Sequence, residues 1–276
     1  NPAMSDPDLN HARKALSKLE HLVVQDIFLT ETAMFADIIL PASAFPEKTG
    51  TFTNTDRRVQ MGRKAIDPPG RAKQDWWIIQ ELANRMGLNW RYSHPSDVFS
   101  EMQQMMPSLN GITWDRLLRE SAVTYPCADE NSIGESIIFA DGYPTASGRG
   151  KLVPCDILPP DEQPDTDFPF ILTTGRLLEH WHTGAMTRRA SVLDTIEPEP
   201  FVHISPTDLV KWSIKPGDKV RVATKRGMIE LSARSDIGVP DGVIFIPFCY
   251  SEAAVNFLTN PALDPFGKIP ELKFSA

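Results

Sequence analysis

The chain has 276 residues, of which 41% are hydrophobic, and this length and composition suggest about two soluble globular domains. Its formal net charge is −8 and no basic run is interleaved with aromatic residues, so nucleic acid is not expected as a partner. No apolar stretch reaches the roughly 18 residues that suggest a membrane span, and the first residues lack the pattern of a signal peptide.

The three cysteines, Cys127, Cys155 and Cys249, form no CxxC pair that would suggest zinc or an iron–sulfur cluster. We therefore predict three reduced thiols, which agrees with a cytoplasmic location. A periplasmic location stays open. The sequence begins at Asn1 without an initiator methionine, and we expect the chain to be a piece of a longer protein.

Residues 1–90 alternate between helical and strand-like patterns. The helical segments carry apolar residues at spacings of three and four, and the strand-like segments are largely apolar. The predicted elements are helices at Leu9–Leu19, Glu31–Phe35 and Asp75–Met86 and strands at Leu22–Phe28 and Asp37–Leu40. Apolar strands between helices are typical of a parallel sheet, so we predict an α/β unit here.

Residues 91–165 are predicted to be a connection, with short helices after Ser96 and Thr113 and then irregular sequence rich in Pro, Gly and Asp. Residues 166–276 are predicted to form a mostly β domain, a small barrel with one or two helices. Its expected strands are Phe170–Thr174, Val202–Ile204, Lys219–Thr224, Met228–Ala233 and Val243–Pro247. Ser205 and Pro206 provide the cap and first residue of a helix that continues to Trp212.

The densest group of polar side chains is TGRLLEHWHTGAMTRR, Thr174 to Arg189, which follows a predicted strand. Guanidinium groups suit phosphates, while imidazole and hydroxyl groups can bond the edge of a heterocycle, so the segment favours a phosphorylated heterocyclic ligand. A solvated charged loop around a buried Trp is the alternative. His180 and His182 could also bind zinc, but no third ligand stands at a matching spacing.

A second polar group is EKTGTFTNTDRRVQ, Glu47 to Gln60, which could bind a ligand or form only a polar turn. Asp26 ends a predicted strand and could bond a ribose or guanine, or could be satisfied within the protein. The segment Ala253 to Lys273 reads as a structured loop. No nucleophile stands beside a base, and no glycine-rich phosphate loop is present.

These groups, in this order, resemble the molybdopterin oxidoreductase superfamily over essentially the whole chain. TETAMFADIILPASAFPEKTGTFTNTDRRVQ is similar to the end of the family's third domain. GRLLEHWHTGAMTRR and KPGDKVRVATKRG are similar to its fourth, a double-psi β-barrel that binds the dinucleotide. LEHWHTGAMTRR is shared with periplasmic nitrate reductases, whereas SVLDTIEPEPFVHISP and LTNPALDPFGKIPELK favour the formate dehydrogenase α subunit, particularly the NAD-linked kind.

The resemblance implies a bis-molybdopterin guanine dinucleotide that carries Mo or W. Formate would be oxidised to CO2, and electrons would leave through iron–sulfur clusters to a flavin and NAD. The resemblance implies that the pterin or its phosphates are bound by Arg176, His180, His182, Thr183 and Thr187. It implies further pterin contacts at Asn256 and Lys273, and guanosine contacts at Asp56 and Asp75. No metal ligand is expected in this chain.

The resemblance also places the catalytic residues and the ligands of the 4Fe-4S clusters before Asn1. The expected partners are therefore the N-terminal part of the same subunit and iron–sulfur and flavin subunits that reduce NAD, and the isolated chain should be inactive. Two other readings stay open. The chain could be part of a nitrate reductase, or a non-catalytic module that binds the pterin cofactor.

Overall fold

The computed structural model describes residues 1–276 and divides into two units, each with its own core. The first unit combines Asn1–Ile39 with Ile157–Ala276, and the second is Leu40–Asp156. The sequence suggested other divisions, near residues 90 and 165. No helix in the structure has the length and apolar character needed to cross a membrane.

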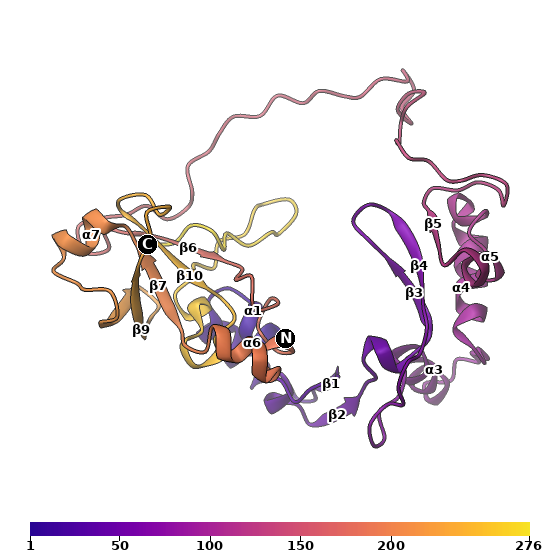
Figure 1. Ribbon diagram of the computed structural model, residues 1–276, viewed down its shortest axis with the longest axis horizontal. Coiled ribbons are helices and arrows are strands. Elements are labelled where there is room, and N and C mark those ends of the chain that lie inside the picture. The colour runs from indigo at the N-terminus through magenta and orange to yellow at the C-terminus, as the bar shows by residue number, and fades with distance from the viewer. The chain divides into compact units, whose positions relative to one another are not determined.

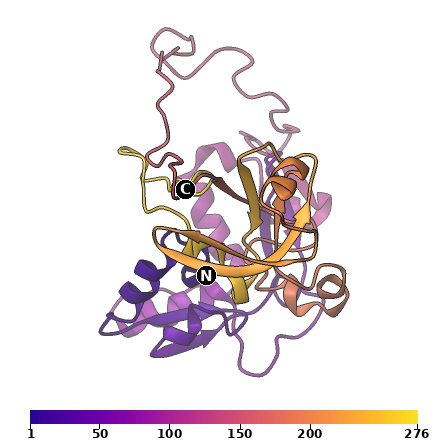
Figure 2. The ribbon, with the colours of Figure 1, turned by 90° about the vertical axis from the view of Figure 1, so that its left-hand side faces the viewer.

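A curled five-stranded sheet dominates the first unit (Figures 1 and 2). In the order of the sheet its strands are β6 (Ile171–Gly175), β10 (Val243–Pro247), β7 (Phe201–Ile204), β9 (Gly227–Ser235) and β8 (Lys219–Thr224). The pairs β6–β10 and β7–β9 are parallel, and β7–β10 and β8–β9 are antiparallel. All five predicted strands are present to within two residues, because alternate side chains face one apolar core.

Three helices accompany this sheet, namely α6 (Ser191–Ile196), α7 (Pro206–Lys211) and the 3₁₀ turn η4 (Thr187–Arg189). The hydroxyl of Ser205 accepts a hydrogen bond from the Asp208 amide at 3.1 Å, which confirms the predicted start of α7. After β10 the chain continues through the short turns η5 (Ser251–Ala253) and η6 (Val255–Phe257).

The N-terminal part of the first unit contains α1 (Pro2–Ser5), α2 (Leu9–Leu16), β1 (Val23–Asp26) and the turn η1 (Ala33–Phe35), and β1 pairs with β2 (Ile38–Pro41). The α2 helix is capped by Asp8, whose carboxylate accepts from the His11 amide at 3.4 Å. Leu9 and Met4 pack with Ala254, so this part is anchored on the segment after β10.

The second unit contains η2 (Phe45–Glu47), β3 (Gly50–Thr53), β4 (Arg58–Gly62), α3 (Asp75–Arg85), α4 (Pro95–Met105), η3 (Pro107–Leu109), α5 (Trp114–Glu120) and β5 (Ala122–Thr124). The strands form an antiparallel sheet in the order β3-β4-β5. Val59 and Met61 of β4 pack against Phe99, Leu117 and Val123. Residues 95–124 are therefore part of this unit's core and not the connection expected from sequence. The segment without helix or strand is 125–170.

Candidate functional site

The polar segment predicted to bind a ligand lies in a loop that leaves the carboxyl end of β6 and ends at η4. We call residues 176–189 the 176–189 loop. The hydrogen bonds of its backbone amides are internal. The amide of Trp181 donates to the Thr187 hydroxyl at 2.9 Å, and the amide of Gly184 donates to the Trp181 carbonyl at 2.9 Å. Gly184 has a φ of +73°, and a Cβ there would lie 2.7 Å from the Cys249 carbonyl oxygen, so the turn needs glycine.

The two histidines of this loop face different surroundings. His180 is buried, and its Nε2 donates to the carbonyl oxygen of Glu197 at 2.8 Å, while its buried Nδ1 has no partner within the protein. His182 is exposed, with a φ of +49° and its ring 4.6 Å from that of Trp181. No group of three His, Cys, Asp or Glu side chains that could hold a metal is present, so the zinc reading gains no third ligand.

Two of the three arginines in the loop bond to the protein itself. Arg188 donates to Asp194 and Glu252, both at 2.7 Å, and its guanidinium lies 4.7 Å from the centre of the Tyr250 ring. Burial alone would lower the pKa of Arg188, but the hydrogen bonds to Glu252 and Asp194 outweigh burial and raise it. Arg189 donates to the Ala185 carbonyl at 2.6 Å and to a carbonyl outside the loop at 3.0 Å. These two cations shape the loop.

Arg176 and Lys273 are the basic pair left for a ligand. Arg176 is exposed directly after β6, and the Lys273 ammonium donates to the carbonyl of Thr174 at the end of the same strand. The Thr174 hydroxyl also donates to the Leu272 carbonyl at 2.7 Å, which holds the tail against β6. Burial, and then the charge of Arg176, lower the pKa of Lys273. An anion between these cations would relieve their repulsion.

The other predicted residues have different environments. Asn256 is buried, and its amide donates to the Met4 carbonyl at 2.8 Å, so it ties α1 to η6. Asp56 and Asp75 belong to the second unit. Asp56 is exposed in the β3–β4 turn and accepts from the Arg58 amide at 3.2 Å, and Asp75 begins α3 and pairs with Lys48.

Sequence reasoning missed the groups that hold the loop from outside it. Glu197, Arg234 and Tyr250 contact one another or the loop through hydrogen bonds that span 17 to 53 residues of sequence. No local pattern connects them, because each comes from a different element. Only the three-dimensional fold brings them together.

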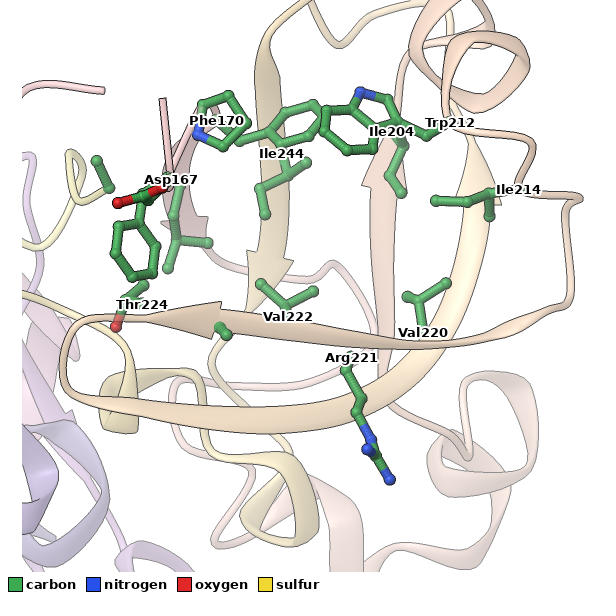
Figure 3. A pocket seen from close by; sticks show the side chains of 15 residues that line it. Asp167, Phe170, Ile204, Trp212, Ile214, Val220, Arg221, Val222, Thr224 and Ile244 are labelled. Carbon is green, nitrogen blue, oxygen red and sulfur yellow. The ribbon is translucent and has the colours of Figure 1, made fainter. Parts of the chain in front are cut away.

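An apolar cavity of about 280 Å³ lies within the curled sheet (Figure 3). Val220 and Val222 of β8 point into it and Arg221 points away, and the rings of Phe170 and Trp212 lie 5.5 Å apart at its edge. Because no cation points into it, this cavity does not suit a phosphorylated ligand. The 176–189 loop and Lys273 do, since they offer exposed cations, a hydroxyl at Thr183 and the unpartnered Nδ1 of His180.

Comparison with known proteins identifies the domains in which these residues lie. A family model described as "Molybdopterin oxidoreductase" matches residues 1–85, and one described as "Molydopterin dinucleotide binding domain" matches residues 170–276, which include the whole loop and Lys273. The chain belongs to the molybdopterin oxidoreductase family.

The chain is 49% identical over 278 residues to the F420-dependent formate dehydrogenase subunit alpha of Methanocaldococcus jannaschii, and the match covers 100% of this chain and 41% of that relative. It is 34% identical over 285 residues to the assimilatory nitrate reductase catalytic subunit of Bacillus subtilis, covering 100% of this chain and 40% of the relative. The chain thus spans about two fifths of the length of these relatives.

Acetylene hydratase from Pelobacter acetylenicus has a similar structure, with a TM-score of 0.73 and 20% identity over 99% of this chain and 42% of that one. At this identity the likeness concerns the fold alone. The predicted fold class, an α/β part followed by a double-psi β-barrel domain, is confirmed.

Proposed function

We propose that the chain is the cofactor-binding part of a formate dehydrogenase catalytic subunit, which oxidises formate to CO2. The observation that carries the proposal is the 49% identity to a formate dehydrogenase subunit over the full length of this chain. The identity to the nitrate reductase subunit over the same span is lower, at 34%. This difference favours formate over nitrate as the substrate.

A molybdopterin guanine dinucleotide with Mo or W is the cofactor that the donors of the site fit. When bound, it supplies the metal centre at which a substrate exchanges two electrons. Arg176 and Lys273 would bond its phosphates, and His182 and Thr183 would bond the edge of a heterocycle. His180 has only a buried acceptor, Nδ1, to offer.

The remaining predicted contacts are of two kinds. Thr187 and Asn256 are better assigned to supporting the site, because both already bond to other parts of the protein. Asp56 and Asp75 are proposed contacts of the guanosine on the strength of the family resemblance, since carboxylates can accept from the N–H groups of guanine.

More polypeptide is expected to cover the first unit, and we propose that it is the rest of the same subunit. The β1–β2 sheet has only two strands, and Val23, Ile38 and Ile39 are exposed on it. Two-stranded sheets are marginal by themselves, and parallel sheets of α/β domains are normally covered on both faces. The length of the curated relatives leaves ample chain for this cover.

Electrons would leave through 4Fe-4S clusters held outside this chain and through iron–sulfur and flavin subunits. Sequence alone suggested NAD as the acceptor, whereas the names of the similar subunits from Methanocaldococcus jannaschii and Methanococcus maripaludis favour F420. We propose F420 as the first acceptor to test and NAD as the second. The free cysteines support a cytoplasmic location.

The test is to express the complete subunit from its full coding sequence with its neighbouring electron-transfer subunits. Formate-dependent reduction of a viologen dye, together with GMP released by acid hydrolysis, would support the proposal. Nitrate reduction without formate oxidation would replace it with the nitrate reductase reading. Released GMP without either activity would favour a non-catalytic cofactor-binding module. Formate oxidation by the 276-residue chain alone would contradict the assignment of catalysis to residues outside it.

A further inference from the structure

We infer that the ion pair of Glu197 and Arg234 is a positioning element for the 176–189 loop. The pair holds the Glu197 main chain in place, and the Glu197 carbonyl in turn sets the orientation of His180. This inference rests on the proposed function, in which the loop binds the pterin dinucleotide. Neither residue is assigned a contact with the cofactor.

The carbonyl oxygen of Glu197 is a shared acceptor. It receives a hydrogen bond from His180 Nε2 at 2.8 Å and a second from the hydroxyl of Tyr250 at 3.1 Å. His180 belongs to the loop, and Tyr250 follows β10. The rings of His180 and Tyr250 also meet edge to face, 6.0 Å apart. One carbonyl therefore joins two segments that lie 70 residues apart, from 180 to 250.

The carboxylate of Glu197 is held in two places by Arg234. The two N–H···O distances are 2.9 and 2.7 Å, the forked geometry that fixes both side chains most firmly. Arg234 sits on β9, and its guanidinium lies 3.7 Å from the centre of the Phe201 ring on the neighbouring strand β7. The cation is thus fixed by a rigid sheet and a stacked ring.

Glu197 is the C-terminal cap residue of the short helix α6, which is not part of the sheet. Without the pair, the carboxyl end of α6 would be held less firmly, and the Glu197 carbonyl could shift. His180 is buried, so loss of its acceptor would leave an unpartnered N–H and favour another ring orientation. Trp181, His182 and Thr183 follow directly, so a change at His180 would displace the groups proposed to face the cofactor.

Arg188 provides a parallel attachment. It binds Asp194 within α6 and stacks on Tyr250, so that α6, Tyr250 and the loop form one connected group. The Glu197–Arg234 pair is the only side-chain ion pair that connects the carboxyl end of α6 to β9. Removal of the pair should therefore loosen the loop without unfolding the sheet.

The experiment uses the assembled holoenzyme and four variants. Arg234→Gln and Glu197→Gln each remove one partner, and Glu197→Arg with Arg234→Glu exchanges the two charges. Arg221→Gln is the matched control, because it breaks another Arg–Glu pair of the same sheet, the exposed Arg221–Glu230 pair at 2.6 Å. The first readout is the amount of GMP released per folded subunit, measured after gel filtration. The second is the amide hydrogen exchange of peptides that cover residues 176–189.

We expect both single variants to lose the nucleotide about tenfold faster than the wild type, as is usual when a residue that orients a ligand's direct contacts is removed. Their loop amides should exchange faster, and the exchanged pair should recover most of both properties. The control should match the wild type. Thermal melting of each variant shows whether the sheet is intact, and Arg234→Lys, which keeps the charge, replaces Arg234→Gln if that variant does not fold.

Three results would overturn the inference. The single variants could retain nucleotide and loop protection like the wild type. The exchanged pair could fail to recover either property, which would indicate a direct role for one side chain. The control could show the same loss as the single variants. If the wild type itself released no GMP, the proposed function would fail, while hydrogen exchange would still decide whether the pair positions the loop.

Discussion

Glu162 lies in the segment that precedes the barrel and joins this segment to two distant parts of the barrel domain. The structure allows the effect of replacing Glu162 by Gln to be predicted quantitatively. Its carboxylate accepts from Arg226 at 3.0 and 2.8 Å and from the amide of Ala276 at 2.9 Å. Only 12% of the Glu162 side chain and 15% of the Arg226 side chain are exposed. Glu162→Gln would leave the Arg226 cation largely buried without its counter-charge and would direct an amide N–H₂ toward a donor.

Loss of one partner from a fully buried ion pair costs about 3 to 5 kcal/mol. Because this pair is partly exposed, we expect Glu162→Gln to cost about 2 kcal/mol. This corresponds to a roughly 30-fold increase in the population of the state in which residues 270–276 have detached. Hydrogen exchange of peptides that cover residues 270–276 measures this opening directly. Glu230→Gln, in the exposed pair with Arg221, is the control and should change the opening free energy by less than about 0.5 kcal/mol.

The effect should depend on pH. Burial alone would raise the pKa of Glu162, but the hydrogen bonds from Arg226 and the Ala276 amide outweigh burial and lower it below its ordinary value of 4.5. A lowered pKa in the folded state means that the stabilisation is complete above pH 4.5 and is lost as the pH falls through the folded-state value. The wild type and Glu162→Gln should therefore converge in acid. Equal exchange at pH 7 would refute the reasoning.

The remaining predictions concern the loop and its supports. Gly184→Ala should lower the Tm. The left-handed backbone alone costs about 1 to 2 kcal/mol for alanine, and the new Cβ would collide with the Cys249 carbonyl oxygen. An unchanged Tm would show that the turn has another conformation. Burial raises the pKa of Cys249 to about 12, so iodoacetamide at pH 8 should label the exposed Cys155 and spare Cys249, as peptide mass spectrometry can check. Asn256→Ala should cost about 1 to 3 kcal/mol, seen as faster exchange in residues 2–16, since it leaves the buried Met4 carbonyl without its donor.

The barrel strands could be predicted from sequence because their signal is local. In β9, Ile229, Leu231 and Ala233 are buried while the residues between them are not, and glycine or proline turns separate neighbouring strands. The β3–β4 hairpin could not be predicted in the same way. Its buried side chains are few, and the threonines and charges around its turn resembled a ligand-binding loop.

The short helices after Ser96 and Thr113 were predicted and are present as α4 and α5, but their packing into a core was not predicted. α4 and α5 are short, and Phe99 and Leu117 become a core only by packing against β4, which lies about 40 to 60 residues earlier. The chemistry of the candidate site was predictable as a set of residue types. Its geometry was not, because His180 and His182 are two residues apart and only the folded structure shows that His180 is the buried one, bonded to the Glu197 carbonyl.

The pairing of β6 with β10 has a consequence for the order of events during synthesis. The first strand of the barrel domain aligns with the last, and Leu172 bridges to Ser275, so the sheet closes around residues more than 70 positions apart. Such distant pairings form late and slowly. β6 must wait, unpaired on this side, until β10 and the segment around Ser275 have left the ribosome. Lys273 lies in that segment, so under the proposed function the cofactor can be inserted only after the chain has been made through this lysine.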